Sequence, residues 1–156
     1  MREQVFYQSP LGGLILEASE KALFCIKFAE NFDHKIPEKT ENKILLKTLE
    51  QLHEYFFDKR MMFDIPLNSQ GTDFQKKVWK ALSKIPYGTT VSYKHIAIDI
   101  GNEKAVRAVG GANNKNPIPI LIPCHRVLGM RGDLVGYAGG VESKKKLLEL
   151  EGCNYK

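Results

Sequence analysis

The stretch that decides how this 156-residue chain is interpreted is Asn116-Pro117-Ile118-Pro119-Ile120-Leu121-Ile122-Pro123-Cys124-His125-Arg126-Val127. Its three prolines fix the backbone on the approach to a single cysteine, because the pyrrolidine ring locks φ. The apolar residues between the prolines form a run that leads straight into Cys124. The pattern therefore predicts a rigid, buried segment from which the Cys124 thiol emerges.

Cys124 has the neighbours that a reactive thiol needs. A free cysteine has a pKa of about 8.5, so only a few per cent of it is thiolate at neutral pH. His125 follows directly and can take the proton, and Arg126 adds positive charge nearby. A carboxylate behind the histidine would orient it and stabilise an imidazolium, and the end of the chain offers Glu149 and Glu151. The alternative is a cysteine that is simply packed in the core.

The first part of the chain has the pattern of strands followed by a helix. Residues 4–9 and 14–19 flank the turn signal Pro10-Leu11-Gly12-Gly13, and residues 22–29 alternate with a period of two. Residues 41–58 place Leu45, Leu49, Leu52 and Phe56 on one helical stripe. Residues 63–67 could form a further short strand.

The second part begins at about residues 68–71 and has the pattern of helices. Thr72 and Gln75 form a capping-box pattern that starts a helix, which Pro86-Tyr87-Gly88 ends. Ser92 is the expected N-cap of a helix through residue 100, and Gly101-Asn102 leads into another helix over residues 103–113. This pair is a candidate helix-turn-helix. A last helix is expected over residues 141–151, with Gly152 as its C-terminal cap.

Positive charge is concentrated in that second part. Residues 69–156 contain 14 Lys or Arg and 7 Asp or Glu, whereas residues 1–68 contain 9 and 11. A basic region beside a slightly acidic one favours a polyanionic partner, although a solvated lysine-rich surface would give the same counts.

The composition bounds the class of protein. Apolar residues make up 43% and charged residues 26%, which is typical of a globular protein. Since no apolar run approaches the ~18 residues that span a bilayer and the N-terminus has no signal pattern, we expect a soluble cytoplasmic protein, or a nuclear one in a eukaryote, without membrane contact. The three cysteines include no Cys-x-x-Cys pair, so we expect neither a disulfide framework nor a metal site.

Five motifs together resemble a known family. From Phe74 to Gly152 the chain is similar to the active-site domain of the methylated-DNA–protein-cysteine methyltransferases, also called 6-O-alkylguanine-DNA alkyltransferases. The motifs occur in the family's order and at its spacing, and they are Val91-Ser92-Tyr93, Arg107-Ala108-Val109-Gly110-Gly111-Ala112, Asn116-Pro117, Ile122-Pro123-Cys124-His125-Arg126-Val127 and Gly136-Tyr137-Ala138-Gly139-Gly140. The first part of the chain matches the family only loosely.

The resemblance implies an α+β fold and a repair activity. Residues 1–68 would form a small antiparallel sheet plus a helix, ribonuclease-H-like, and residues 69–156 a helical DNA-binding and active-site domain with a helix-turn-helix. The activity would be transfer of a methyl or other alkyl group from 6-O-alkylguanine in DNA to the protein's own cysteine, irreversibly and once per molecule. The resemblance implies a monomer that needs no cofactor. Some relatives bind zinc in the first domain, but its ligands are not evident in this sequence.

The resemblance also assigns catalytic roles. Cys124 would accept the alkyl group, His125 would act through a water as the base, and Glu151 rather than Glu149 would hold that histidine. The sulfur would then be a poised anion at the bottom of a cleft sized for one purine. Tyr93 would donate a hydrogen bond near the ring nitrogen N3 of guanine.

Other residues would bind the extruded base. Tyr137 and the backbone amide of Ala138, where many relatives have Ser, would meet the oxygen at position 6. Asn116 would tie the turn before the active-site segment, Pro119 would pack against the base, and carbonyl groups near Cys124 and Val127 would read its amino group. For the tyrosines the alternative is ordinary packing.

The second helix of the helix-turn-helix would enter the minor groove of double-stranded DNA. Arg107 would fill the place in the stack that the flipped base vacates, the alternative being a phosphate contact. Because that groove is only about 6 Å wide, the helix needs small residues on its DNA face. These would be Ala105, Ala108, Gly110, Gly111 and Ala112. The alternative is that the two glycines end the helix early.

Two other classes of protein remain open at this point. A DNA-binding regulator or damage sensor would use the helix-turn-helix without chemistry, but sensor relatives lack the reactive cysteine. A Cys-His hydrolase would turn over and would need neither the basic second part nor Arg107.

Overall fold

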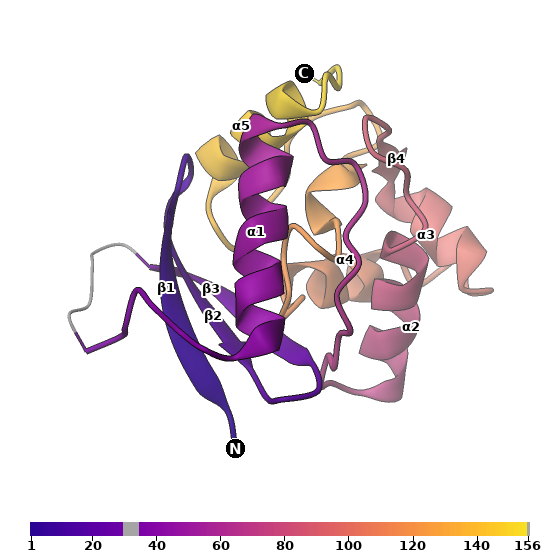
Figure 1. Cartoon of the computed structure of the whole chain (residues 1–156). Helices are drawn as coiled ribbons and strands as arrows, with labels where there is room; N and C mark the ends of the chain where they lie inside the picture. The colour runs from indigo at the N-terminus through magenta and orange to yellow at the C-terminus, as the bar shows by residue number, and fades with distance from the viewer. Residues whose placement is uncertain (30–34, 156) are drawn as a thin grey trace. The chain divides into compact units, whose positions relative to one another are not determined.

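A computed structural model describes residues 1–29 and 35–155 (Figure 1). The chain folds as two compact units, Met1–Gln70 and Gly71–Lys156. In the described residues, no helix is long and apolar enough to cross a membrane. In the same residues, no three His, Cys, Asp or Glu side chains gather where they could hold a metal ion.

The first unit is a three-stranded antiparallel sheet with one helix. Its strands β1 (Glu3–Ser9), β2 (Gly12–Ala18) and β3 (Leu23–Ala29) lie in the order β1-β2-β3. Helix α1 (Lys43–Phe57) starts where the side chain of Asn42 accepts a hydrogen bond from the Leu45 amide at 2.9 Å. It packs on the sheet through a buried stripe, so the three predicted strands and the helix are confirmed.

Two details of this unit differ from the prediction. Strand β2 begins at Gly12 because Pro10-Leu11 alone makes the turn, and Gly12 takes the positive φ of 103° that the reversal requires. Residues 63–67 form a single bridge to β3, between Leu23 and Leu67, and not a strand. Pro66 has no N–H to continue a ladder at that edge.

The second unit is built on helices whose starts the sequence encodes. In α2 (Asp73–Leu82) the side chains of Thr72 and Gln75 each accept from the other's backbone amide, at 3.1 and 2.9 Å. In α3 (Tyr93–Asp99) the Ser92 hydroxyl accepts from the His95 amide at 3.0 Å. Both predicted N-caps are thereby confirmed.

The second helix of the helix-turn-helix, α4 (Val106–Asn114), starts later than the predicted residue 103. After α3, Gly101 has a φ of 80° and the Asn102 amide donates to the Ala97 carbonyl at 2.9 Å, a Schellman ending. A turn from Asn102 to Ala105 then uses the residues expected in the helix. Helix α4 packs against α2 and α3, and buried Trp79 of α2 donates from Nε1 to the Ala112 carbonyl at 2.8 Å.

The remaining elements carry the cysteine segment. The short strand β4 (Val91–Ser92) precedes α3 and pairs in parallel with β5 (Val127–Leu128), which follows the 3-10 turn η1 (Cys124–Arg126). This ladder was not predicted, because two residues are too few to show a period. It fixes the start of α3 beside the end of η1.

Helix α5 (Val141–Leu150) ends in a second Schellman motif. Gly152 has a φ of 77°, its amide donates to the Glu149 carbonyl at 3.1 Å, and the Cys153 amide donates to the Leu148 carbonyl at 2.8 Å. The predicted cap at Gly152 is confirmed, and it places Glu151 at the last position before the chain leaves the helix.

Candidate active site

The proline-framed segment is folded around the side chain of Asn116. Its Nδ2 donates to the Ile122 carbonyl at 2.7 Å, and its Oδ1 accepts from the Ile118 amide at 3.0 Å. Within this loop Ile120 has a φ of 77°, a conformation that a β-branched residue rarely adopts. The Asn116 clamp therefore holds the segment in a strained form that its local preferences would not select.

The backbone turns sharply just before Cys124. Pro123 has φ −79° and ψ 64°, and the Cys124 amide donates to the Ile122 carbonyl at 2.8 Å, which is an inverse γ-turn. The Cys124 carbonyl accepts from the Val127 amide and, at 3.4 Å, from Nδ2 of Asn113.

The protonation state predicted for Cys124 is wrong for the free protein. The residue is 2% exposed, and burial raises the pKa of its thiol to about 11. A hydrogen bond from Asn116 and the charge of Lys144 lower this pKa, but burial outweighs them. The apolar frame that makes the segment rigid also removes the water that would solvate a thiolate. The sulfur therefore needs a proton acceptor when it reacts.

His125 supplies a ring nitrogen for that purpose. Its Nε2 lies 2.8 Å from Oε2 of Glu151, and both side chains are buried. Burial lowers the pKa of His125, although Glu151 raises it, so the ring is neutral. The proton then sits on Nε2, where it donates to Glu151. Nδ1 is buried and has no hydrogen-bond partner among the described residues, so its lone pair is available.

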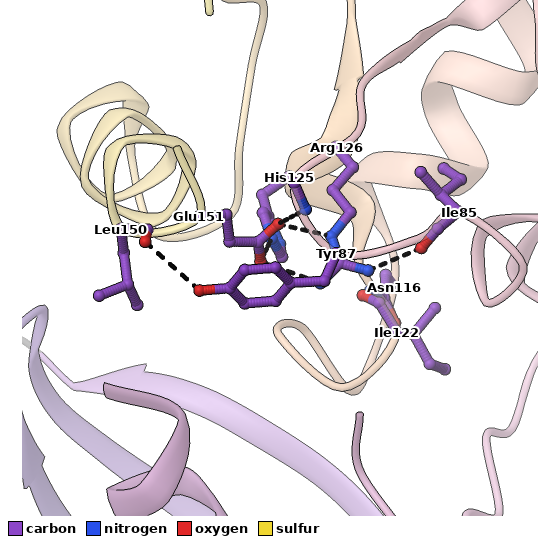
Figure 2. Close-up of polar contacts among 9 residues, drawn as sticks. Ile85, Tyr87, Asn116, Ile122, His125, Arg126, Leu150 and Glu151 are labelled. Carbon is purple, nitrogen blue, oxygen red and sulfur yellow. Dashed lines mark hydrogen bonds and ion pairs between the residues drawn. The ribbon is translucent and has the colours of Figure 1, made fainter. Parts of the chain in front are cut away.

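Glu151 is bound from three more directions (Figure 2). Arg126 donates from Nε to Oε1 at 2.8 Å and from Nη2 to Oε2 at 2.9 Å, and the Gly88 amide donates to Oε1 at 3.2 Å. Glu149, the other candidate, is exposed and accepts from Tyr155. The carboxylate behind His125 in this structure is that of Glu151.

The guanidinium of Arg126 does not lie where the sequence suggested. We expected it to add positive charge at Cys124, but it is turned to Glu151, and its Nη1 donates to the Ile85 carbonyl at 2.7 Å (Figure 2). The reason is that η1 turns successive side chains to different sides. The cation near the sulfur is Lys144, which the sequence analysis missed.

Lys144 is fully buried on α5, and its Nζ donates to the Val135 carbonyl at 2.7 Å. Burial lowers its pKa to about 8, and a thiolate at Cys124 and the charge of Asp133 would each oppose that shift. It is one of three successive lysines at residues 144–146, but it shares a helix face with buried Leu147 and Leu148. That spacing is the signal that could have identified it.

The two tyrosines remain neutral phenols. Tyr93 begins α3, and burial raises its pKa; the hydroxyl of Tyr137 is buried, which raises its pKa well above the usual value. A thiolate at Cys124 would raise both pKa values further, so both phenols lie near the sulfur. A neutral phenol can donate a hydrogen bond.

The other residues predicted to contact the base differ in exposure. Pro119 and Val127 are buried, and Ala138 is exposed in the loop before α5. A base could reach Pro119 only after that residue is uncovered.

The residues predicted to bind DNA lie on or next to α4. Arg107, Ala108 and Gly111 are exposed, Gly110 is half-buried, and Ala105 is the half-buried N-cap. Ala112 is buried on the side of α4 that packs against α2, so the prediction that it lies on the DNA face is wrong. A Cβ added at Gly111 would meet no described atom within 4 Å, and one at Gly110 would meet only Tyr93, at 4.0 Å. The glycines do not end the helix, which continues to Asn114, so that alternative is wrong. The packing of the free protein does not require either glycine.

The two units match the two domains of one family. Residues 73–153 match the model of the 6-O-methylguanine DNA methyltransferase DNA-binding domain, and residues 4–69 match the model of the ribonuclease-like domain. The chain belongs to the 6-O-methylguanine DNA methyltransferase family, and the predicted family and fold class are confirmed.

Relatives match over nearly the whole chain. The methylated-DNA–protein-cysteine methyltransferase of Methanosarcina barkeri is 49% identical over 150 residues, which are 94% of this chain and 95% of the relative. The constitutive enzyme of that name from Bacillus subtilis is 42% identical over 161 residues, covering 96% and 94%. The crystal structure of Mycobacterium tuberculosis OGT in complex with DNA superposes with a TM-score of 0.87 at 43% identity, covering 96% of this chain and 92% of that one.

The buried neutral state of His125 predicts how stability depends on pH. Because its folded pKa lies below the unfolded value of about 6.5, the unfolded state binds the proton first, and the folded state loses stability as pH falls below that value. One such proton gives a slope of up to about 1.4 kcal/mol per pH unit. Urea unfolding at a series of pH values should show this slope in the wild type and a shallower one in His125→Asn. Parallel curves for the two proteins would contradict the assignment.

Proposed function

We propose that this protein repairs double-stranded DNA by transferring a methyl or other alkyl group from 6-O-alkylguanine irreversibly to Cys124. The observation that carries the proposal is the buried run Cys124-His125, with Glu151 behind the histidine, inside the unit that matches a DNA-binding domain. The names of the relatives support the same activity. The acceptor is a side chain and a thioether does not hydrolyse, so each molecule acts once and needs no cofactor.

The substrate has to leave the helix before it can react. The oxygen at position 6 points into the duplex, so the base must rotate out, which costs a few kcal/mol of stacking and pairing. We assign the second helix of the helix-turn-helix to the minor groove, where exposed Ala108 and Gly111 allow close approach. Arg107, exposed on the same helix, fills the vacated place in the stack.

The chemical step begins with the proton of the thiol. Nδ1 of His125 takes it through a water, while the Nε2 proton stays shared with Glu151. The sulfur electron pair then attacks the alkyl carbon in line, and the bond from that carbon to the guanine oxygen breaks with its electron pair left on guanine. Because burial holds the resting thiol protonated, the proton leaves as the substrate arrives.

Neutral donors meet the charge that develops on guanine. Tyr93 donates toward N3, and Tyr137 with the Ala138 amide donates toward the oxygen, which stabilises the leaving anion in an apolar pocket. Burial raises the pKa of both phenols, so both remain protonated and able to donate these hydrogen bonds. Asn116 positions the segment, while Pro119 and Val127 contact the base.

The wider assignment follows from the same proposal. Residues 1–68 form the ribonuclease-like domain, and residues 69–156 carry both DNA binding and alkyl transfer. The protein acts as a monomer in the cytoplasm, or in the nucleus if its source is a eukaryote, because that is where its DNA substrate lies.

Stoichiometric transfer predicts a permanent change in protein mass. Incubation with a duplex that contains 6-O-methylguanine should add one methylene per chain, and peptide mapping should locate it on Cys124. Cys124→Ala should show no addition, whereas Cys153→Ala, which removes a half-buried bystander thiol, should react like the wild type. Binding without a mass shift would indicate a damage sensor, and turnover of a substrate without arrest would indicate a hydrolase.

The stacking role of Arg107 predicts a difference between two substrates. Arg107→Ala should slow repair of the duplex about tenfold or more, because base stacking on a side chain is worth about 1–3 kcal/mol. The same variant should react normally with the free base analogue benzylguanine, which needs no flipping. Lys47→Ala, which removes an exposed cation from the other unit, is the matched control and should leave both rates unchanged. Equal loss on the two substrates would contradict the stacking role.

A further inference from the structure

The guanidinium of Arg126 and the ring of His125 share one carboxylate. Oε1 of Glu151 accepts from Arg126 Nε, and Oε2 accepts from both Arg126 Nη2 and His125 Nε2, all at 2.8 to 2.9 Å. The Glu151 and His125 side chains have no exposed surface, and that of Arg126 is 7% exposed. Two groups that can each carry a positive charge therefore compete for one buried negative charge.

We propose that Arg126 is a positioning residue for alkyl transfer, whose charge neutralises Glu151 and so keeps His125 uncharged with Nδ1 open to the thiol proton. The inference rests on the proposed function, because it concerns the base of that reaction. It assigns Arg126 no contact with the alkyl group or the DNA.

The geometry gives the guanidinium a task that a lysine could not perform. The planar fork spans both oxygens of Glu151, and the remaining Nη1 donates to the Ile85 carbonyl at 2.7 Å, so the group is held at three points. The ring of Tyr87 lies 5.8 Å from the guanidinium carbon, and the Tyr87 hydroxyl donates to the Leu150 carbonyl at 3.4 Å (Figure 2). An ammonium at this position would keep the charge but could not make the two parallel bonds.

The charge of Arg126 opposes the effect of Glu151 on His125. A lone carboxylate at 2.8 Å would favour imidazolium, and an imidazolium cannot accept the thiol proton. Burial is the largest factor that lowers the pKa of His125, and the charges of Arg126 and Lys144 lower it further. If Arg126 were removed, Glu151 would keep its charge, and the His125 ring, which is hydrogen-bonded directly to it, would be favoured as the cation that balances it.

Other titratable groups face this cluster from several elements. The phenols and thiols among them stay protonated and uncharged because burial raises their pKa values, so the charge that they add near neutral pH is that of the Lys144 ammonium, and none of them bridges the two oxygens of Glu151 in the bonds described. They are Lys144 of α5, Cys124 of η1, Tyr87 of the turn after α2, Tyr137 of the loop before α5 and Cys153 beyond α5.

The test is the pH dependence of single-turnover alkylation by benzylguanine, followed by intact mass. In the wild type the rate should fall at low pH as His125 becomes protonated. This fall at low pH is the acidic limb of the pH–rate profile. In Arg126→Gln the midpoint of the acidic limb should shift to higher pH by about one unit or more, which makes the reaction about tenfold slower at pH values on that limb. In Arg126→Lys the charge remains, so the limb should stay near the wild-type position even though the overall rate drops.

A merely structural role for Arg126 would give a different pattern. Both variants would then be slower by the same factor at every pH, with an unmoved limb, and the proposal would be overturned. The failure of any protein to become alkylated would instead overturn the proposed function.

A double-mutant cycle that combines Arg126→Gln with Glu151→Gln keeps the test decisive if Arg126→Gln alone does not fold. Glu151→Gln should move the acidic limb down, because the carboxylate that favours imidazolium is gone. Adding Arg126→Gln to that variant should move the limb up again, since a cation near the ring has been removed. Titration of the His125 ring by NMR measures the same shifts without any alkylation, and an unchanged ring pKa across the cycle would contradict the role of Arg126.

Discussion

The second unit depends on one buried carboxylate. Glu151 accepts from the ring of His125, from two nitrogens of Arg126 and from the backbone of Gly88. These bonds join the end of α5, the turn η1 and the turn that follows α2. A buried charge is tolerated only when its hydrogen bonds are made, so the elements have to meet in this arrangement.

The position of that carboxylate is itself set by backbone geometry. Gly152 at a φ of 77° ends α5 in a Schellman motif, and the residue before it is Glu151. On the other side of the site, Asn116 closes the loop that delivers Cys124, with Ile120 held in the left-handed region. Two local motifs thus fix the nucleophile and the group that orients its base, and the loop that delivers the nucleophile is held in a strained conformation at Ile120.

Much of this arrangement could be predicted because it is written in short-range patterns. The capping box of Thr72 and Gln75, the N-cap Ser92 and the C-terminal glycine Gly152 each act within a few residues, and the structure has all three. The motif around Cys124 gave the family. The expected roles of the individual site residues remain proposals.

What could not be predicted depends on three-dimensional packing. No pattern within η1 shows that Arg126 turns to Glu151 rather than to the sulfur, or that the two-residue strands β4 and β5 pair. Buried Lys144 sits in a run of lysines that resembles a solvated surface. The buried, protonated state of Cys124 depends on how tightly the apolar segment packs around the thiol. The sequence shows that the segment is apolar, but it does not show how closely it packs.

The network around Glu151 holds His125 neutral, with its proton on Nε2 and its Nδ1 free of a hydrogen-bond partner among the described residues. The most direct measurement is the nitrogen NMR spectrum of the 15N-labelled His125 ring in the free wild-type protein at neutral pH. We expect the two well-separated ring nitrogen shifts of a neutral imidazole, with the protonated resonance assigned to Nε2. Two similar shifts typical of an imidazolium, or a proton found on Nδ1, would contradict it.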